Sequence, residues 1–125
     1  MGRIIHTTHP TRQRAATLKR IASMIRDYPR TNDSQIDIRE LSELLIAGLR
    51  EIQESVNRTA AAWEKRDYWL KADAFRRQWR WVDEMIAGMT KALQAGDRPS
   101  LQAQILELKR RMETSTSSRS SKRRS

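Results

Sequence analysis

The chain has 125 residues and a formal net charge of +10 at pH 7, and its hydrophobic content of 38% allows one domain with one modest core. It contains no cysteine, which excludes disulfides, thiolate nucleophiles and cysteine-ligated metal centres. No apolar run approaches the ~18 residues that a membrane-spanning helix needs. With four glycines and three prolines, the composition favours helices over a turn-rich sheet.

The first predicted helix covers residues 12–28 and follows an irregular segment, residues 1–10, that ends at Pro10. A narrow apolar stripe runs along it at steps of three and four: Leu18, Ile21, Ile25 and Tyr28. Pro29 ends this helix, and residues 30–35 form a polar connection.

The second predicted helix covers residues 37–65 and has one broad apolar face. The residues of this face are Leu41, Leu44, Leu45, Leu49, Ile52, Val56 and Trp63. Gly48 lies on the same face, where a missing side chain would let a neighbouring helix approach closely.

The third predicted helix, residues 67–94, carries a sustained heptad pattern. Its members are Tyr68, Ala72, Phe75, Trp79, Val82, Ile86, Met89 and Leu93. The step of five from Trp63 to Tyr68 allows two interpretations: a turn near residues 64–67 that makes an antiparallel helix pair, or one long helix over 37–94. We favour the turn because helices beyond about 25 residues are uncommon in compact domains.

Gly96 and Pro99 predict a stop, after which a final helix over residues 100–112 carries Leu101, Ile105, Leu108 and Met112 on one stripe. Residues 114–125 contain only Thr, Ser, Arg and Lys and offer nothing to bury, which predicts disorder. The predicted fold is therefore all-α: an elongated three- or four-helix bundle on a long antiparallel pair, with a helical domain at 11–113 and a disordered basic C-terminal tail.

The positive charge is concentrated at the two ends of the chain. Residues 1–35 and residues 99–125 each carry seven basic and two acidic side chains, whereas residues 36–98 carry eleven of each. A basic excess attracts nucleic acid, acidic proteins or anionic membranes, so we expect any such attraction to lie on the first helix and on the tail.

A second apolar stripe lies behind the heptad seam of the third helix. It consists of Leu70, Ala74, Trp81, Met85, Gly88 and Ala92. A helix with two apolar faces sits centrally in a bundle or presents one face to a partner. Because the other helices are short, we predict that this stripe docks a protein partner or a second copy of the chain.

Aromatic and basic residues alternate from Trp63 to Trp81, a mixture that can stack on bases and neutralise phosphates. The candidate contacts for nucleic acid or an acidic partner are Trp69, Arg76 and Arg80, together with Arg119, Lys122, Arg123 and Arg124 in the tail. Packing into the core is the competing interpretation for the aromatic residues.

The sequence contains no Gly-rich phosphate loop, no Glu-x-x-His pair and no nucleophile beside a base in an ordered segment. We therefore expect no enzymatic activity, cofactor or metal. The predicted function is a helical protein-interaction or assembly module, and the alternative is a small basic protein that binds RNA or DNA backbones. A cytoplasmic location is expected, with organelle import through the Arg-rich start and nuclear targeting through the tail as open alternatives.

Overall fold

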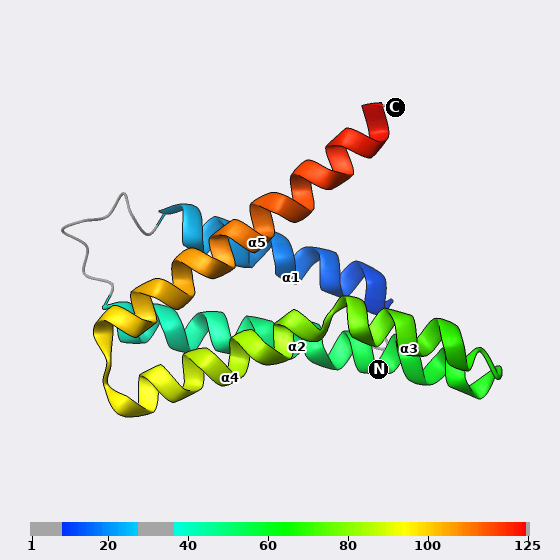
Figure 1. Ribbon diagram of the computed structural model, residues 1–125, viewed down its shortest axis with the longest axis horizontal. Coiled ribbons are helices and arrows are strands. Elements are labelled where there is room, and N and C mark those ends of the chain that lie inside the picture. Colours follow the sequence, from blue (N-terminus) through cyan, green and yellow to red (C-terminus); the bar gives the residue numbers. More distant parts are fainter. Residues whose placement is uncertain (1–8, 28–36, 125) are drawn as a thin grey trace, which may run out of the picture.

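The computed structural model describes residues 9–27 and 37–124, with side chains described as far as Glu113. Five helices follow one another along these residues: α1 (Pro10–Asp27), α2 (Ile38–Lys65), α3 (Trp69–Gln78), α4 (Arg80–Ala95) and α5 (Arg98–Arg124). The described residues contain no strand. Helix α2 runs antiparallel to α3 and α4, and α1 and α5 pack on one side of this hairpin (Figure 1). The predicted all-α bundle on an antiparallel helix pair is confirmed.

The turn between α2 and α3 lies at the predicted place, so the alternative of one helix over residues 37–94 is wrong. The Tyr68 N–H donates to the Trp63 carbonyl at 2.9 Å, and the Asp67 N–H donates to the Glu64 carbonyl at 2.9 Å. This pair of bonds is a Schellman motif, and it requires a left-handed residue, here Asp67 with φ of 66°. Aspartate tolerates this conformation better than most residues, so the turn forms without glycine.

Replacing Asp67 tests the conformation of this turn. Glycine adopts positive φ without steric cost, so we expect Asp67→Gly to raise the free energy of unfolding by about 0.5–1 kcal/mol. Asp73→Gly, inside α3, should lower it by about 1 kcal/mol because glycine is a poor helix former. Urea denaturation measures both changes, and an equal loss at both positions would contradict the motif.

Helices α3 and α4 replace the single predicted helix over residues 67–94. Trp79 separates them with φ of −103° and ψ of 10°, and its N–H is shared between the carbonyls of Phe75 and Arg76 at 3.2 Å each. The Trp79 and Trp81 rings stack with centroids 6.2 Å apart. Side chains at i and i+2 do not face each other in a regular helix, so the break helps to bring these two rings together.

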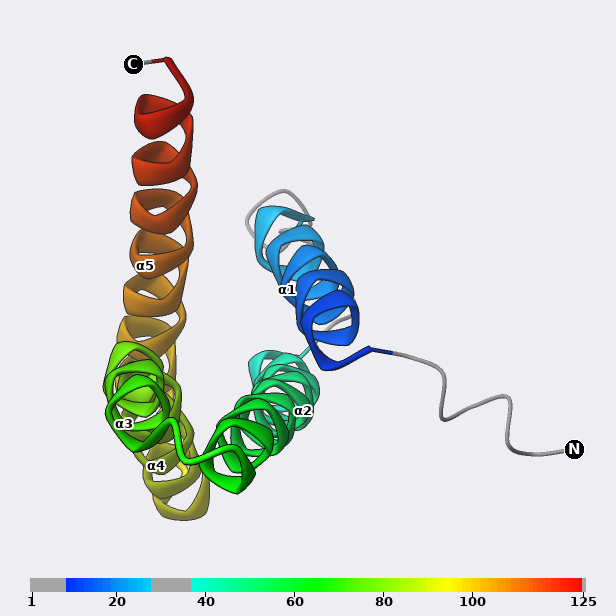
Figure 2. The ribbon, with the colours of Figure 1, turned by 90° about the vertical axis from the view of Figure 1, so that its right-hand side faces the viewer.

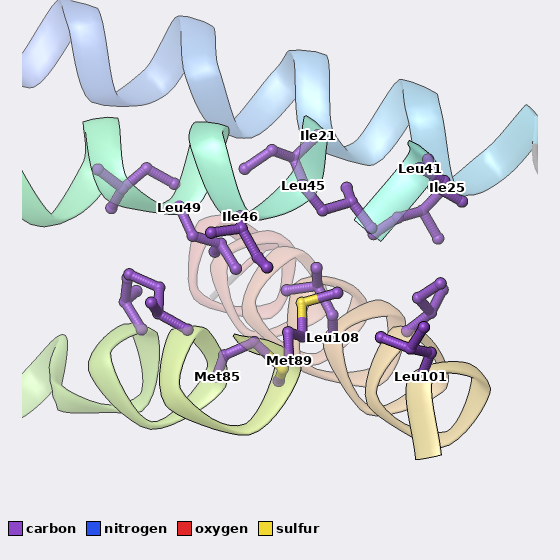
Figure 3. Packing of buried hydrophobic residues seen from close by; sticks show 14 of the residues in the cluster. Ile21, Ile25, Leu41, Leu45, Ile46, Leu49, Met85, Met89, Leu101 and Leu108 are labelled. Atoms are coloured by element: carbon purple, nitrogen blue, oxygen red, sulfur yellow. The ribbon is translucent and has the colours of Figure 1, made fainter. Parts of the chain in front are cut away.

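The core lies between α2 and the helices α1, α4 and α5 (Figure 3). It is built from the predicted stripes: Ile21 and Ile25 of α1, Leu41, Leu45, Leu49, Ile52 and Val56 of α2, Val82, Ile86 and Met89 of α4, and Leu101, Ile105 and Leu108 of α5 are all buried. Other members of the stripes are partly buried: Leu18, Trp63, Phe75, Trp79, Leu93 and Met112. Two are exposed, Leu44 at 53% and Tyr68 at 50%, and Tyr28 lies outside the described residues. Leu44 lies at the edge of the α2 face, and Tyr68 lies in the turn rather than inside a helix.

Gly48 allows α1 to lie close to α2, as its position predicted. A Cβ atom at Gly48 would lie 3.0 Å from Ile21 Cγ1 and 3.1 Å from Ile21 Cδ1. These distances are shorter than an ordinary van der Waals contact, so a larger residue at position 48 would require the Ile21 side chain to shift.

The end of α4 repeats the Schellman motif with glycine. The Asp97 N–H donates to the Ala92 carbonyl at 3.0 Å, and Gly96 has φ of 66°. Asp97 then caps α5, because its carboxylate accepts a hydrogen bond from the Ser100 N–H at 3.2 Å.

The last helix starts two residues earlier than predicted, and its backbone continues to Arg124 rather than ending at residue 112. The prediction of disorder concerns residues 114–125, whose side chains lie outside the described residues, so it stays a prediction.

Candidate interaction surfaces

The predicted docking stripe does not form one free surface, because α5 covers the part of it that α4 carries. Met85 and Ala92 are buried within the chain, at 4% and 6% exposure. A Cβ atom at Gly88 would lie 2.8 Å from Gln104 Nε2, so the small residue admits a side chain of α5. The prediction that these residues meet an external partner is therefore corrected: their partner is the last helix of the same chain.

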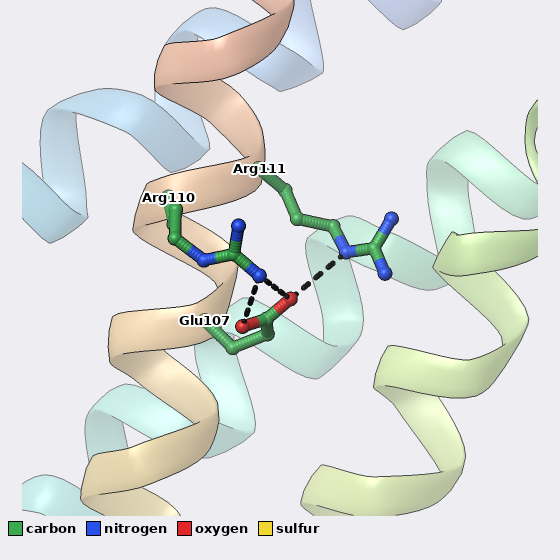
Figure 4. Close-up of polar contacts among 3 residues, drawn as sticks. All are labelled: Glu107, Arg110 and Arg111. Carbon is green, nitrogen blue, oxygen red and sulfur yellow. Dashed lines mark hydrogen bonds and ion pairs between the residues drawn. The ribbon is translucent and has the colours of Figure 1, made fainter.

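Trp81 belongs to this covered part and is half-buried. The guanidinium of Arg111 lies 5.7 Å from its ring centroid, a cation–π contact between α4 and α5. Arg111 is held in turn by Glu107, whose carboxylate accepts a hydrogen bond from Arg111 Nε at 3.2 Å and bonds from Arg110 at 2.8 and 2.9 Å (Figure 4).

The Glu107 carboxylate offers a direct test of this cluster. The hydrogen bonds from Arg110, followed by the charge of Arg110 and the bond and charge of Arg111, hold the pKa of Glu107 below its ordinary value. We expect carbon-detected NMR titration to give a midpoint below that of an isolated glutamate, and a return to the ordinary pKa in the double variant Arg110→Gln, Arg111→Gln. Because the folded pKa is depressed, any contribution to stability is present above the unfolded pKa and is lost as pH falls through the folded one.

The α3 part of the stripe stays exposed, and it adjoins two aromatic residues that were not assigned to it. Leu70 is 87% exposed, Trp69 is 59% exposed and Tyr68 is half exposed. Together with Asp67 and Lys71 they line an open depression at the end of the hairpin. We call residues 65–71 the hairpin tip, because the chain turns there from α2 into α3.

The hairpin tip is also basic. Lys65, Arg66 and Lys71 are exposed there, against one acidic residue, Asp67. The ammonium of Lys71 lies 4.9 Å from the Trp63 ring centroid and 5.9 Å from that of Tyr68. The tip therefore combines three exposed apolar or aromatic side chains with three cations.

The candidate nucleic-acid residues of the bundle have different surroundings. Trp69 lies in the hairpin tip, and Arg80 is exposed beyond the helix break. Arg76 forms an ion pair with Glu64, and the neighbouring Arg77 pairs with Asp73 at 3.5 Å. The two carboxylates neutralise part of the positive charge that was predicted for the aromatic and basic stretch from Trp63 to Trp81. The side chains of Arg119, Lys122, Arg123 and Arg124 lie outside the described residues.

Sequence reasoning missed the environment of Arg14, which is only 8% exposed. Its guanidinium lies 5.0 Å from the Phe75 ring centroid and 5.5 Å from that of Trp79, and it donates a hydrogen bond to Ser55 Oγ at 3.2 Å. Burial lowers the pKa of this guanidinium, which remains protonated near neutral pH. The available signal was spacing: Arg14 precedes Leu18 by four residues and so extends the α1 stripe.

Helices that belong to the two basic ends of the sequence lie against each other. Helices α1 and α5 contact each other and both lie on the same side of the hairpin (Figure 2). Their exposed cations include Arg12, Lys19, Arg26, Arg110 and Arg111. The side of the molecule that carries α1 and α5 therefore presents exposed cations from both helices.

Among residues 9–27 and 37–113, no three His, Asp or Glu side chains gather in a way that could hold a metal ion. Within the described part of the chain, no helix has the length and apolar content to cross a membrane. Comparison with known protein families, curated proteins and solved structures finds no match to this chain.

Proposed function

We propose that this chain is a non-enzymatic helical interaction or assembly module, and that the hairpin tip is its contact surface. The observation that carries the proposal is the exposure of Tyr68, Trp69 and Leu70 at three consecutive positions. Aromatic residues are concentrated at the contact sites of proteins, and neighbouring exposed apolar side chains mark interaction sites. The ribbon supports access to this surface, because the tip extends beyond α1 and α5 (Figure 1).

A second copy of the chain is a poor partner for the tip alone. Three side chains of this size present on the order of 500 Å² between them, whereas a stable interface buries about 800 Å² on each partner. A stable dimer through the tip alone is therefore not expected, and a protein partner of another kind would also need contacts beyond these three side chains.

Site-specific crosslinking tests the proposal. A photoreactive benzoylphenylalanine at position 69 of the full chain, expressed in cells of its source, should give discrete adducts on irradiation. The same group at Leu106, which is 65% exposed on α5, is the matched control and should give none of these adducts. Equal adduct patterns from both positions, or neither a protein nor a lipid adduct from position 69, would contradict docking through the tip.

Binding of nucleic-acid backbone remains the second candidate, and the packing of basic helices α1 and α5 on one side favours it. Such binding should weaken steeply with salt, since it would depend on phosphate neutralisation. The full chain and a variant with glutamine at Arg119, Lys122, Arg123 and Arg124 should differ in affinity for generic RNA and DNA. The absence of binding at low salt would remove this candidate.

A further inference from the structure

We propose that the partner of the hairpin tip is the interface of an anionic lipid bilayer, into which Tyr68, Trp69 and Leu70 insert. This inference rests on the proposed function, because it assigns a partner to the same surface. Three features of the tip support a lipid surface over a protein groove: the arrangement of its apolar side chains, the kind of side chain, and its charge.

The apolar side chains of the tip are consecutive in the chain and line one open depression at the end of the hairpin. A helix that docks into a protein groove presents residues at i, i+3, i+4 and i+7 along one face. Tyr68, Trp69 and Leu70 are instead consecutive, and about 100° separates each residue from the next around a helix axis. Tyr68 also precedes the first residue of α3. A short group of consecutive exposed side chains around an open depression at the end of a hairpin suits a soft, flat surface better than a groove that takes one long helix face.

The side chains are those that the bilayer interface favours. Tryptophan and tyrosine are enriched at the level of lipid headgroups because each has an apolar body and a polar end. Leu70, at 87% exposure, is the most exposed of the large hydrophobic residues described. A leucine beside two such rings can reach the acyl boundary while the rings stay at headgroup depth, as in proteins that lie on one leaflet.

The charge of the tip complements an anionic surface. Lys65, Arg66 and Lys71 are exposed beside the three apolar side chains, and Asp67 is the only acid among residues 65–71. Long basic side chains keep their charge at the headgroups while their carbon chains lie along apolar surface. The neighbouring Glu64 is paired with Arg76, so it adds little negative charge at this end.

Vesicle flotation with the full chain tests the inference. The probes are vesicles of phosphatidylcholine with about 30% phosphatidylserine, and vesicles of phosphatidylcholine alone, in about 0.15 M salt. We expect the chain to float with the anionic vesicles. The double variant Trp69→Ser, Leu70→Ser should weaken this partitioning at least about tenfold, because two large apolar side chains no longer leave water.

Matched variants separate insertion from general attraction of a basic chain. Leu44→Ser with Leu106→Ser removes two exposed leucines outside the tip and should leave partitioning within about twofold. Lys65→Gln, Arg66→Gln and Lys71→Gln should weaken it more than glutamine at Arg12, Lys19 and Arg26, although both remove three charges. Bromine atoms on the lipid chains should quench tryptophan emission in the unmodified chain but much less in Trp69→Ser, Leu70→Ser.

The inference is overturned if the tip variants and their controls partition equally, or if the chain does not float at all. Thermal melting of each variant checks that it is folded, and the exposed positions make this the expected result. If the chain does not float but position 69 gives a discrete protein adduct, the lipid partner is rejected and the docking function is kept. Absence of both would reject both.

Discussion

Replacing Leu45 with alanine is expected to lower the free energy of unfolding by about 3–5 kcal/mol, because the side chain is fully buried and its removal leaves a cavity. The same replacement at the adjacent Leu44 is expected to cost less than about 1 kcal/mol, since 53% of that side chain is already in water. Both residues lie in α2, and both have the same helix propensity before and after the change.

Urea denaturation followed by far-ultraviolet circular dichroism measures both variants. The pair is informative because the apolar pattern of the sequence placed both leucines in the core, whereas the structure buries only one. Similar losses at the two positions would show that Leu44 is covered, and would contradict the packing of α2 described above. If Leu45→Ala does not fold, Leu45→Val gives a smaller loss on the same scale.

Replacing Arg14 with alanine is expected to lower the free energy of unfolding by about 2–3 kcal/mol. The variant loses cation–π contacts to Phe75 and Trp79, the packing of the buried carbon chain and the hydrogen bond to Ser55. Arg14→Lys should recover only part of this loss, because an ammonium cannot lie flat against two rings as a guanidinium does.

Arg12→Ala is the matched control for Arg14, since Arg12 lies on the same helix and is exposed. We expect a change of at most about 0.5 kcal/mol there. Tryptophan fluorescence should shift in Arg14→Ala and stay constant in Arg12→Ala, because Trp79 loses a neighbour only in the first. Equal stability of the two variants would show that the Arg14 side chain does not contribute to the packing of the core. Arg14→Met, which keeps the length of the chain without the charge, would show how much of the effect is packing.

The sequence predicted the helices and most of the core because helical periodicity is a local property. A buried residue every three or four positions is sufficient to identify a helix face, as at Ile21 and Ile25, and glycine sufficed to end α4. The turn before α3 was predicted from a change of phase in the apolar pattern. Its chemistry was not predicted, because aspartate in a left-handed conformation leaves no distinctive sequence signal.

The exposed surface was not predictable in the same way. A second apolar stripe shows that a helix has two faces to cover, but it does not say what covers them. Helix α5 covers Met85 and Ala92 and leaves Leu70 uncovered, since α5 packs against α4 and not against α3. The candidate contact surface is therefore the hairpin tip and not the predicted surface around Trp81 and Met85.

The sequence by itself determined that the chain is helical and that its positive charge lies at its ends, and it favoured a turn near residues 64–67 without excluding one long helix. Only the tertiary structure decided that Arg14 is buried against aromatic rings, that α1 and α5 contact each other, and that Tyr68, Trp69 and Leu70 face water. The physical reason is the range of the interactions. Periodicity and turn conformation depend on neighbours within a few residues, whereas the burial of a helix face depends on which helix, distant in the sequence, packs against it.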